Sequence, residues 1–235
     1  MAMGVAACGE SRQVEVEDSF RVDDSTSSDT AAPPSSTSTP STTAAPGTTE
    51  PGGNAAGTVG SAGVGDALYP GLGNGGYDVE HYRLDLAVEV DDNLLDATAA
   101  IDAVATQPLS RFNLDLDGLE VTAVRVDGDE AEVERVGHEL VIAPSRLIEA
   151  GAGFTVVVEY AGSPEPIADP AVPFDTVGWH RRGGTVYVAS EPSGAMSWFP
   201  SNNHPTDKAT FEFVVTTDAN LTVVANGVLD GVVDA

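Results

Sequence analysis

The residues that could carry chemistry are few and lie far apart in the sequence. Histidine occurs at four positions, His81, His138, His180 and His204, and no two of them form the His-Glu-x-x-His pattern that places two imidazoles on one helix face around zinc. No Gly-x-Ser-x-Gly sequence is present to support a serine-hydrolase triad. We therefore predict no catalytic residue and no metal ligand in this chain, and we expect structural or solvent-exposed roles for its histidines.

Short strands are the elements that must position any functional side chain. Between Tyr82 and Val90 apolar and polar residues alternate with a period of two, which is typical of a half-buried strand. The same kind of pattern recurs in Phe112–Leu116, Val121–Val126, Glu139–Ala143, Phe154–Tyr160, Phe211–Val215 and Leu221–Ala225. Many short strands separated by Gly, Pro and Asn predict an all-β fold, either an antiparallel β-sandwich or a saddle-shaped sheet.

The connections between these strands carry their own expectations. Asn226-Gly227 suits a type I′ hairpin, and Ser145–Ala150 has a short helical pattern. The glycine-rich stretch Gly71–Gly76 lacks the context of a phosphate-binding loop, and we interpret it as linker. Four prolines interrupt Pro164–Gly184, for which we predict a long surface loop, either functional or simply a stiff connector.

The composition divides the chain into three parts. Residues 25–65 are almost wholly Ser, Thr, Ala, Pro and Gly without an aromatic residue, and such a segment buries too little apolar surface to offset its chain entropy. We predict a disordered tether there, an N-terminal segment over residues 1–24, and one β-domain over residues 66–235.

Acidic residues dominate the charge of the chain. Its 37 Asp and Glu against 10 Lys and Arg give a formal net charge of −27, and Lys208 is the one lysine. Such a surface repels nucleic acid and anionic lipid headgroups, so we exclude a nucleic-acid partner. The acidic balance otherwise indicates solubility rather than mechanism.

The single cysteine, Cys8, is a candidate for lipidation. Val5-Ala6-Ala7-Cys8-Gly9 resembles the lipobox of bacterial lipoproteins, and a Ser/Thr/Pro-rich tether follows it. Only five residues precede Ala6, without a basic region or an apolar stretch of ~7–15 residues, so either the true start lies further upstream or the match is accidental. No run approaches ~18 apolar residues, so we expect membrane attachment by a lipid anchor only.

Four segments resemble the N-terminal domain of the M1 family of zinc aminopeptidases. Tyr77–Leu86 looks like the first strand of that domain, Leu114–Val121 like a later strand and turn, and Leu221–Gly227 like its end. The most specific part is the segment that begins Glu191-Pro192-Ser193-Gly194-Ala195-Met196-Ser197-Trp198-Phe199-Pro200 and continues to Lys208. The resemblance runs from about Tyr77 to the C-terminus.

The resemblance implies a role for Glu191. In the family this domain lends one acidic or amide side chain to the active site from the loop before the Phe-Pro pair, and Glu191 falls on that position. Its carboxylate would bind the α-ammonium group of a peptide and register the first peptide bond over zinc. Ala189 stands where many members carry Gln, which puts a second hydrogen bond to substrate in doubt. We expect Trp198 and Phe199 to pack in the core or between domains.

The resemblance also implies a missing partner. The family's zinc, its ligands and its general base belong to a catalytic domain that we expect beyond Ala235, and the β-domain itself is expected to be incomplete at its C-terminus. We therefore predict the substrate-anchoring domain of an extracytoplasmic zinc metallo-aminopeptidase, lipid-anchored or secreted, that is inactive as this chain alone. The alternative is a non-catalytic cell-surface binding or scaffold module that has kept the β-sandwich.

Overall fold

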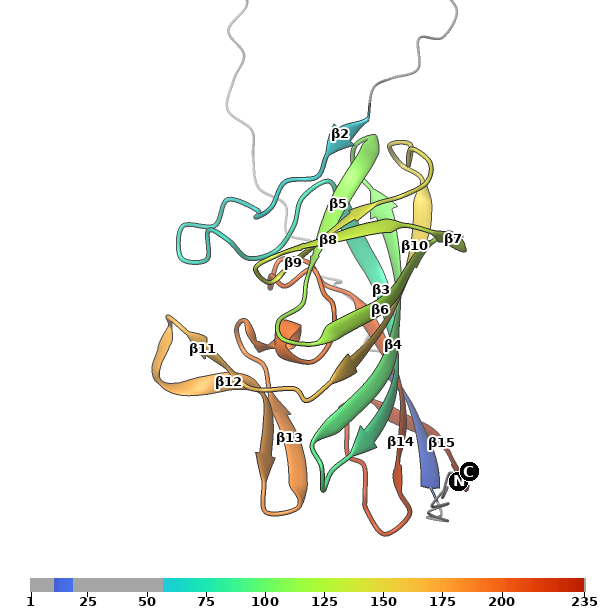
Figure 1. Ribbon diagram of the computed structural model, residues 1–235, viewed down its shortest axis with the longest axis vertical. Helices are drawn as coiled ribbons and strands as arrows, with labels where there is room; N and C mark the ends of the chain where they lie inside the picture. Colours follow the sequence, from blue (N-terminus) through green and yellow to red (C-terminus); the bar gives the residue numbers. More distant parts are fainter. Residues whose placement is uncertain (1–10, 19–56, 235) are drawn as a thin grey trace, which may run out of the picture.

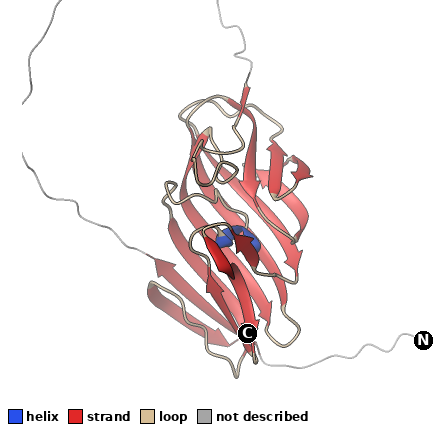
Figure 2. Ribbon diagram, turned by 90° about the vertical axis from the view of Figure 1, so that its left-hand side faces the viewer, coloured by secondary structure: helices blue, strands red, loops and turns tan. Residues whose placement is uncertain are grey.

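The structure is a computed structural model that describes residues 11–18 and 57–234 (Figure 1). Across the described residues strands follow one another without an α-helix, and a single 3₁₀ helix, η1 (Gly194–Ser197), stands among them (Figure 2). The predicted all-β class is confirmed. Nowhere in these two ranges is there a helix long and apolar enough to cross a bilayer.

The largest sheet has eight strands in the order β15-β1-β14-β3-β4-β10-β6-β7. Their bounds are β1 (Ser11–Asp18), β3 (Tyr77–Glu89), β4 (Leu94–Ala105), β6 (Glu120–Val126), β7 (Asp129–Glu130), β10 (Gly153–Gly162), β14 (Thr210–Asp218) and β15 (Val228–Asp234). Neighbouring strands are antiparallel except β14 and β3, which are parallel. The sheet is therefore mixed rather than purely antiparallel.

Two smaller sheets complete the fold. The four-stranded sheet has the order β2-β5-β9-β8, and the three-stranded sheet the order β11-β12-β13. Their bounds are β2 (Thr58–Val59), β5 (Leu109–Asp115), β8 (Glu132–Val136), β9 (Glu139–Ala143), β11 (Ile167–Asp169), β12 (Val172–Arg182) and β13 (Thr185–Ala189).

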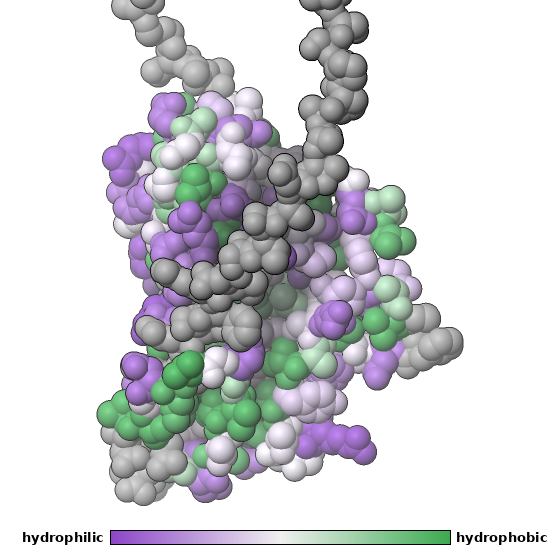
Figure 3. Space-filling view, turned by 180° about the vertical axis from the view of Figure 1, so that it is seen from behind, coloured by the Kyte–Doolittle hydropathy of each residue, from purple (hydrophilic) through white to green (hydrophobic). Residues whose placement is uncertain are grey.

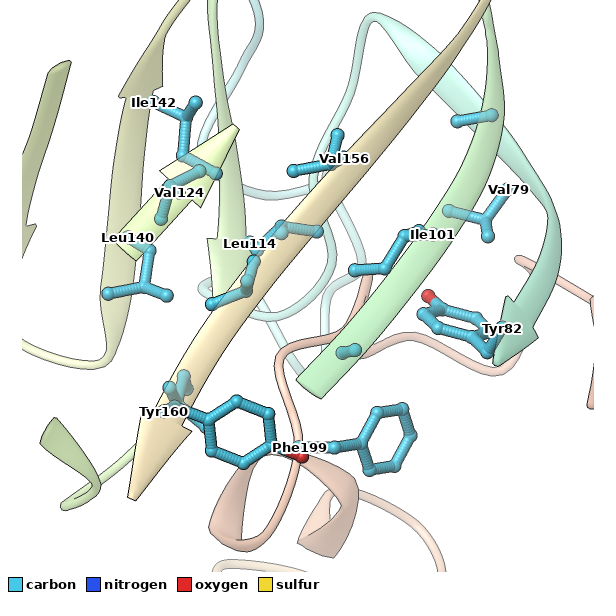
Figure 4. Close-up of a cluster of buried hydrophobic side chains, with 14 of the residues drawn as sticks. Val79, Tyr82, Ile101, Leu114, Val124, Leu140, Ile142, Val156, Tyr160 and Phe199 are labelled. Atoms are coloured by element: carbon cyan, nitrogen blue, oxygen red, sulfur yellow. The ribbon is translucent and has the colours of Figure 1, made fainter. Parts of the chain in front are cut away.

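The core lies between the eight-stranded and four-stranded sheets. The ring of Phe112 on β5 lies 5.7 Å from that of Tyr77 on β3 and 5.4 Å from that of Phe154 on β10, in edge-to-face geometry. Figure 4 shows Leu140 and Ile142 of β9 among the side chains of this core. Burial of each large apolar side chain contributes roughly 1.5–3 kcal/mol, so this interface holds the sandwich together.

Sequence periodicity located the strands with large apolar residues and missed a strand of small ones. Residues predicted in β3, β9 and β10 are strands, and Leu84 and Val158 are fully buried. The central strand β4 was not predicted, because its buried face is largely alanine. Ala97 and Ala99 are 4% and 0% exposed, and they alternate with polar neighbours as a strand requires.

The folded region begins before residue 66, where the prediction placed its start. Residues 57–65, assigned to the tether from composition, hydrogen-bond to the domain: the Thr58 amide donates to the Pro108 carbonyl and the Gly60 amide to the Arg111 carbonyl, both at 2.8 Å. Backbone pairing of this kind needs no apolar side chain, so composition does not reveal it. The rest of the predicted tether, residues 25–56, lies outside the described residues, as does Cys8.

The N-terminal segment also contributes to the sheet. Strand β1 pairs antiparallel with both β14 and β15, and Val14 is 6% exposed. The sequence Val14-Glu15-Val16-Glu17 has the period of two that suits this position, but it was not recognised beside the polar tether.

Three predicted connections were also wrong. Pro164–Gly184 contains β11 and all of β12 rather than a loop, because Pro173 falls in the irregularity between paired Val172 and Thr176 and need not donate to the ladder. No helix forms over Ser145–Ala150, and no strand over Leu221–Ala225, so Asn226-Gly227 precedes β15 instead of closing a hairpin.

Asp207 fastens the chain before β14 to the start of β3. One carboxylate oxygen accepts a hydrogen bond from the Val79 amide at 3.2 Å, and the other accepts one from the Asn202 side-chain amide. Burial, together with the charge of Asp78, raises the pKa of Asp207 from 3.8 to about 6, although both hydrogen bonds lower it.

Replacement of Asp207 by asparagine is expected to remove a pH-dependent loss of stability. The raised pKa means that the folded chain holds this proton more tightly than the unfolded chain, so its contribution to stability is present below 3.8 and is lost as the pH rises through about 6. The free energy of unfolding of the parent, relative to Asp207→Asn, should therefore fall across this window. Denaturant titrations at several pH values measure it, and a difference that stays constant with pH contradicts the assignment.

Candidate functional site

Glu191 lies in the turn between β13 and η1. Strand β13 ends at Ala189, and both Ala189 and Glu191 are exposed. The peptide bond from Glu191 to Pro192 is cis. Within the described ranges, no hydrogen bond or ion pair engages the Glu191 carboxylate. The side chain on which the resemblance places substrate binding is therefore open to solvent and free to accept a ligand.

The residues on either side of Glu191 are firmly held. The Gly194 amide donates to the Ser190 carbonyl at 2.6 Å, and the Trp198 indole N–H donates to the Ser190 hydroxyl at 3.1 Å. After the turn, the Asn203 side-chain amide donates to the Ser193 carbonyl at 2.6 Å. Because both ends of a short turn are fixed, the Glu191 side chain projects from a defined position.

A buried carboxylate anchors the same turn to β11. Asp169 is 3% exposed and accepts a hydrogen bond from the Ser193 hydroxyl. Its other oxygen accepts from the Ala171 amide at 2.7 Å and from the Tyr69 hydroxyl at 3.2 Å. The carboxylate thus joins three segments of the chain, as a buried charge must be hydrogen-bonded to be tolerated.

Two glycines allow β12 and η1 to touch through their backbones. A Cβ atom on Gly178 would lie 2.0 Å from the Ser197 hydroxyl oxygen, and one on Gly194 would lie 2.4 Å from the Gly178 nitrogen. The Ser197 hydroxyl of η1 bonds to both elements: it accepts from the Trp179 amide of β12 at 3.0 Å and donates to the Gly194 carbonyl of η1 at 2.8 Å. No other residue type fits at either glycine without displacement.

Aromatic side chains pack beside the turn that carries Glu191. Trp198 and Phe199 are 9% and 4% exposed, with ring centroids 4.5 Å apart, and Phe199 packs edge-to-face on Tyr82 at 5.5 Å. Figure 4 shows Phe199 beside Tyr82 in the core. The predicted packing role of these two residues is confirmed.

The histidines do not assemble a zinc site of the kind that the M1 resemblance implies. His81 hydrogen-bonds to Thr210, His180 stacks on Tyr187 and His204 bonds to Thr206, each on a different part of the fold. Among the described residues, no group of three potential ligands contains two histidines. The residues in ranges 11–18 and 57–234 do not fit the catalytic zinc of that family.

The sequence analysis did not predict one group of potential metal ligands that the structure brings together. Asp115, His138 and Glu139 offer ligand atoms that all lie within 4.8 Å of one another. Burial raises the pKa of Asp115 to about 6, and burial together with the charge of Asp115 raises that of Glu139 to about 7. The alternation of β5 placed Asp115 on a solvent face, and only the pairing of β5 with β9 brings it to Glu139.

Comparison with known proteins identifies the relatives of this chain. The family model of the peptidase M1 N-terminal domain matches residues 78–234 of this chain. No curated protein sequence matches the chain. Among solved structures, a variant of the M1 zinc metallopeptidase from Deinococcus radiodurans, bound to a Tyr-Ser-Ala substrate, is 35% identical over 65% of this chain, with a TM-score of 0.61. Another structure of the metallopeptidase from Deinococcus radiodurans is 34% identical with the same TM-score. The chain covers 35% of the length of each.

Substitution of Gly178 by alanine is expected to disrupt the contact that fixes the turn. Gly184 is the matched control, because it also has a positive φ but no atom within 4 Å of an added Cβ. Gly184→Ala should cost about 1–2 kcal/mol of the free energy of unfolding through backbone strain alone. Gly178→Ala should cost a further ~1–3 kcal/mol from overpacking. Equal losses in denaturant titrations of the two variants would show that the close contact contributes nothing.

Proposed function

Because the chain belongs to the family of peptidase M1 N-terminal domains, we propose that it is the substrate-anchoring domain of a zinc metallo-aminopeptidase. The observation that carries this proposal is the position of Glu191, exposed and without a partner on a turn whose flanking residues are hydrogen-bonded on both sides. The related metallopeptidase from Deinococcus radiodurans was solved with a Tyr-Ser-Ala substrate, which has the free amino terminus that such a carboxylate would bind.

In the proposed mechanism Glu191 binds the α-ammonium group of the peptide. An exposed ion pair contributes little, so the substrate and a second domain must exclude water from the pair when they close over it. Fixing the amino terminus places the first peptide bond, and no later one, at the reacting position, which makes the enzyme an exopeptidase. The zinc of the family, held in the other domain, supplies a Lewis acid and an activated water when bound.

Ala189 limits how this domain recognises substrate. Its methyl side chain, exposed at the end of β13, offers no hydrogen bond to a peptide backbone. Recognition by this chain therefore rests on the single carboxylate of Glu191, and side-chain preference has to come from elsewhere in the enzyme.

An exposed apolar strip supplies the surface for the second domain. Val228, Leu229, Val232 and Val233 on β15 are 64%, 58%, 48% and 53% exposed. Figure 3 shows apolar side chains gathered at the lower left, the end of the molecule where β14 and β15 lie in Figure 1. Exposed apolar side chains on an edge strand are typical of an interface, so they favour a domain of a larger enzyme over a self-contained scaffold module.

The first test is the intact mass of the native polypeptide that carries this domain, recovered from source cells with an antibody. A product several hundred residues longer than this chain supports the proposal, because it has room for the zinc domain. A product of 235 residues overturns it in favour of the non-catalytic module.

In the longer enzyme, Glu191→Gln is expected to raise KM for peptides with a free amino terminus by about 10- to 100-fold, with a smaller change in kcat. The reason is the loss of one charged hydrogen bond to the ammonium group. Glu165→Gln, another exposed glutamate, is the matched control and should keep the parent kinetics. An unchanged KM for Glu191→Gln refutes the anchoring role.

We also propose that Cys8 carries a lipid that holds the domain outside the cytoplasm at the membrane surface. The support is the small-residue sequence before Cys8 and the polar tether after it. Cys8→Ser should move the protein from the membrane fraction to the soluble fraction and abolish labelling by a radioactive fatty acid. Retention of the variant in the membrane fraction, or a parent protein without label, contradicts the anchor.

A further inference from the structure

Three ligand-bearing side chains converge where β5 ends and β9 begins. In the antiparallel pairing of these strands, Asp115 lies directly opposite Glu139, and His138 is the residue before Glu139. The Asp115 Oδ1 atom lies 3.5 Å from the His138 Nε2 atom, and the ligand atoms of all three residues lie within 4.8 Å of one another. The register of the sheet, rather than a sequence motif, creates this group.

One carboxylate oxygen of Asp115 and one of Glu139 are buried without a hydrogen-bond partner. Asp115 is fully buried and its Oδ1 accepts no hydrogen bond, and the same holds for the buried Oε2 of Glu139. Nearly all buried polar atoms in proteins have a partner, because an unsatisfied one costs the full loss of its hydration. Two unsatisfied carboxylate oxygens that face one histidine indicate that a ligand with positive charge belongs there.

No Lys or Arg side chain in the described part of the chain forms an ion pair with Asp115 or Glu139. Arg135, on the neighbouring strand β8, directs its guanidinium group to the carbonyl oxygens of Leu116 and Leu119, both at 2.5 Å. Of the charged side chains in the described part of the chain, only His138 acts to lower the pKa of the two carboxyl groups. Like charges directly opposite one another in a sheet are destabilising, so the pair requires a bound proton or a cation.

The surroundings already orient the group as a metal site requires. The other oxygen of Asp115, Oδ2, accepts from the Asn74 side-chain amide and the Asn203 backbone amide, each at 3.0 Å. These bonds fix the carboxylate with Oδ1 toward His138, in the manner of the outer partners that hold metal ligands. Asn74 is 1% exposed and its own Oδ1 also has no partner, so a further oxygen is available beside the group.

We propose that Asp115, His138 and Glu139 bind a divalent transition-metal ion of the zinc class. Two ligand atoms bonded to zinc at about 2.0–2.1 Å with a tetrahedral angle lie about 3.4 Å apart, which agrees with the Asp115–His138 separation. A mixed set of imidazole and carboxylates selects zinc or its neighbours rather than calcium or magnesium, which prefer oxygen alone. The half-exposed side chain of His138 provides the path of entry.

The bound ion has a structural consequence. It neutralises the facing carboxylates and ties the end of β5 to the turn before β9, next to the chain that includes Asn203. When His138 carries its proton on Nε2, it donates to the Gly71 carbonyl at 3.2 Å. Metal binding at Nε2 replaces this bond, and the proton of the neutral ring moves to Nδ1, because the metal ligand is a neutral imidazole that keeps one N–H.

The test is a titration of zinc chloride into the full 235-residue chain after treatment with a chelator. Isothermal calorimetry in about 0.5 M NaCl, which screens the acidic surface, should show one ion per chain, and zinc should raise Tm. His138→Ala should weaken binding at least about 10-fold, since even outer partners of a metal site contribute that much. His180→Ala, which removes a histidine stacked on Tyr187 instead, should bind zinc as the parent does.

Two further measurements keep the test decisive. The circular dichroism of each variant without zinc reports folding, and Glu139→Gln, which keeps the size of the side chain, replaces His138→Ala if that variant does not fold. Zinc binding that is equal in parent and variants, no binding above that of the acidic surface, or the same Tm shift with calcium or magnesium would each overturn the proposal. An unchanged KM for Glu191→Gln would not affect the zinc titration, since the two sites share no residue.

Discussion

The arrangement of this domain depends on the joint at Asp115, where a buried strand end meets the chain that leaves the aromatic cluster. The Asp115 amide donates to the Ser201 carbonyl at 2.8 Å, and the Ser201 amide donates back to the Asp115 carbonyl at 3.0 Å. The Asp115 side chain then accepts from the Asn203 amide. Because main chain and side chain act together, this residue fixes the turn of Glu191 relative to the four-stranded sheet.

Amide side chains extend this joint to a segment that has almost no apolar residues. The Asn202 side chain donates to the Asn74 carbonyl at 3.1 Å and accepts from the Asn74 amide at 2.5 Å. The stretch Gly71–Gly76, interpreted as linker from its composition, is thereby built into the domain. Buried polar networks of this kind specify one arrangement of the chain where apolar packing cannot.

Much of the fold could be predicted from the sequence, because large apolar residues at alternate positions mark β3 and β10. The rest depends on contacts that periodicity does not record. β4 buries alanines, and the β12 proline lies in an irregularity of the ladder. Glu191 was found through the sequence around it and not through any property of its own. The pairing of Asp115 with Glu139 could not be found at all, since it exists only in the register between two strands.

The parallel pairing of β14 with β3 has a consequence for the way the chain is made. Thr210 on β14 lies beside His81 on β3 although 129 residues separate them in the sequence. During synthesis one edge of β3 therefore stays without its partner until β14 has left the ribosome, and β1 gains its second neighbour only when β15 has followed. Long-range pairing of this kind folds slowly and leaves a strand edge open to other chains. Completion of the large sheet is thus one of the last events in the biogenesis of this domain, and the nascent chain depends on protection of that edge until then.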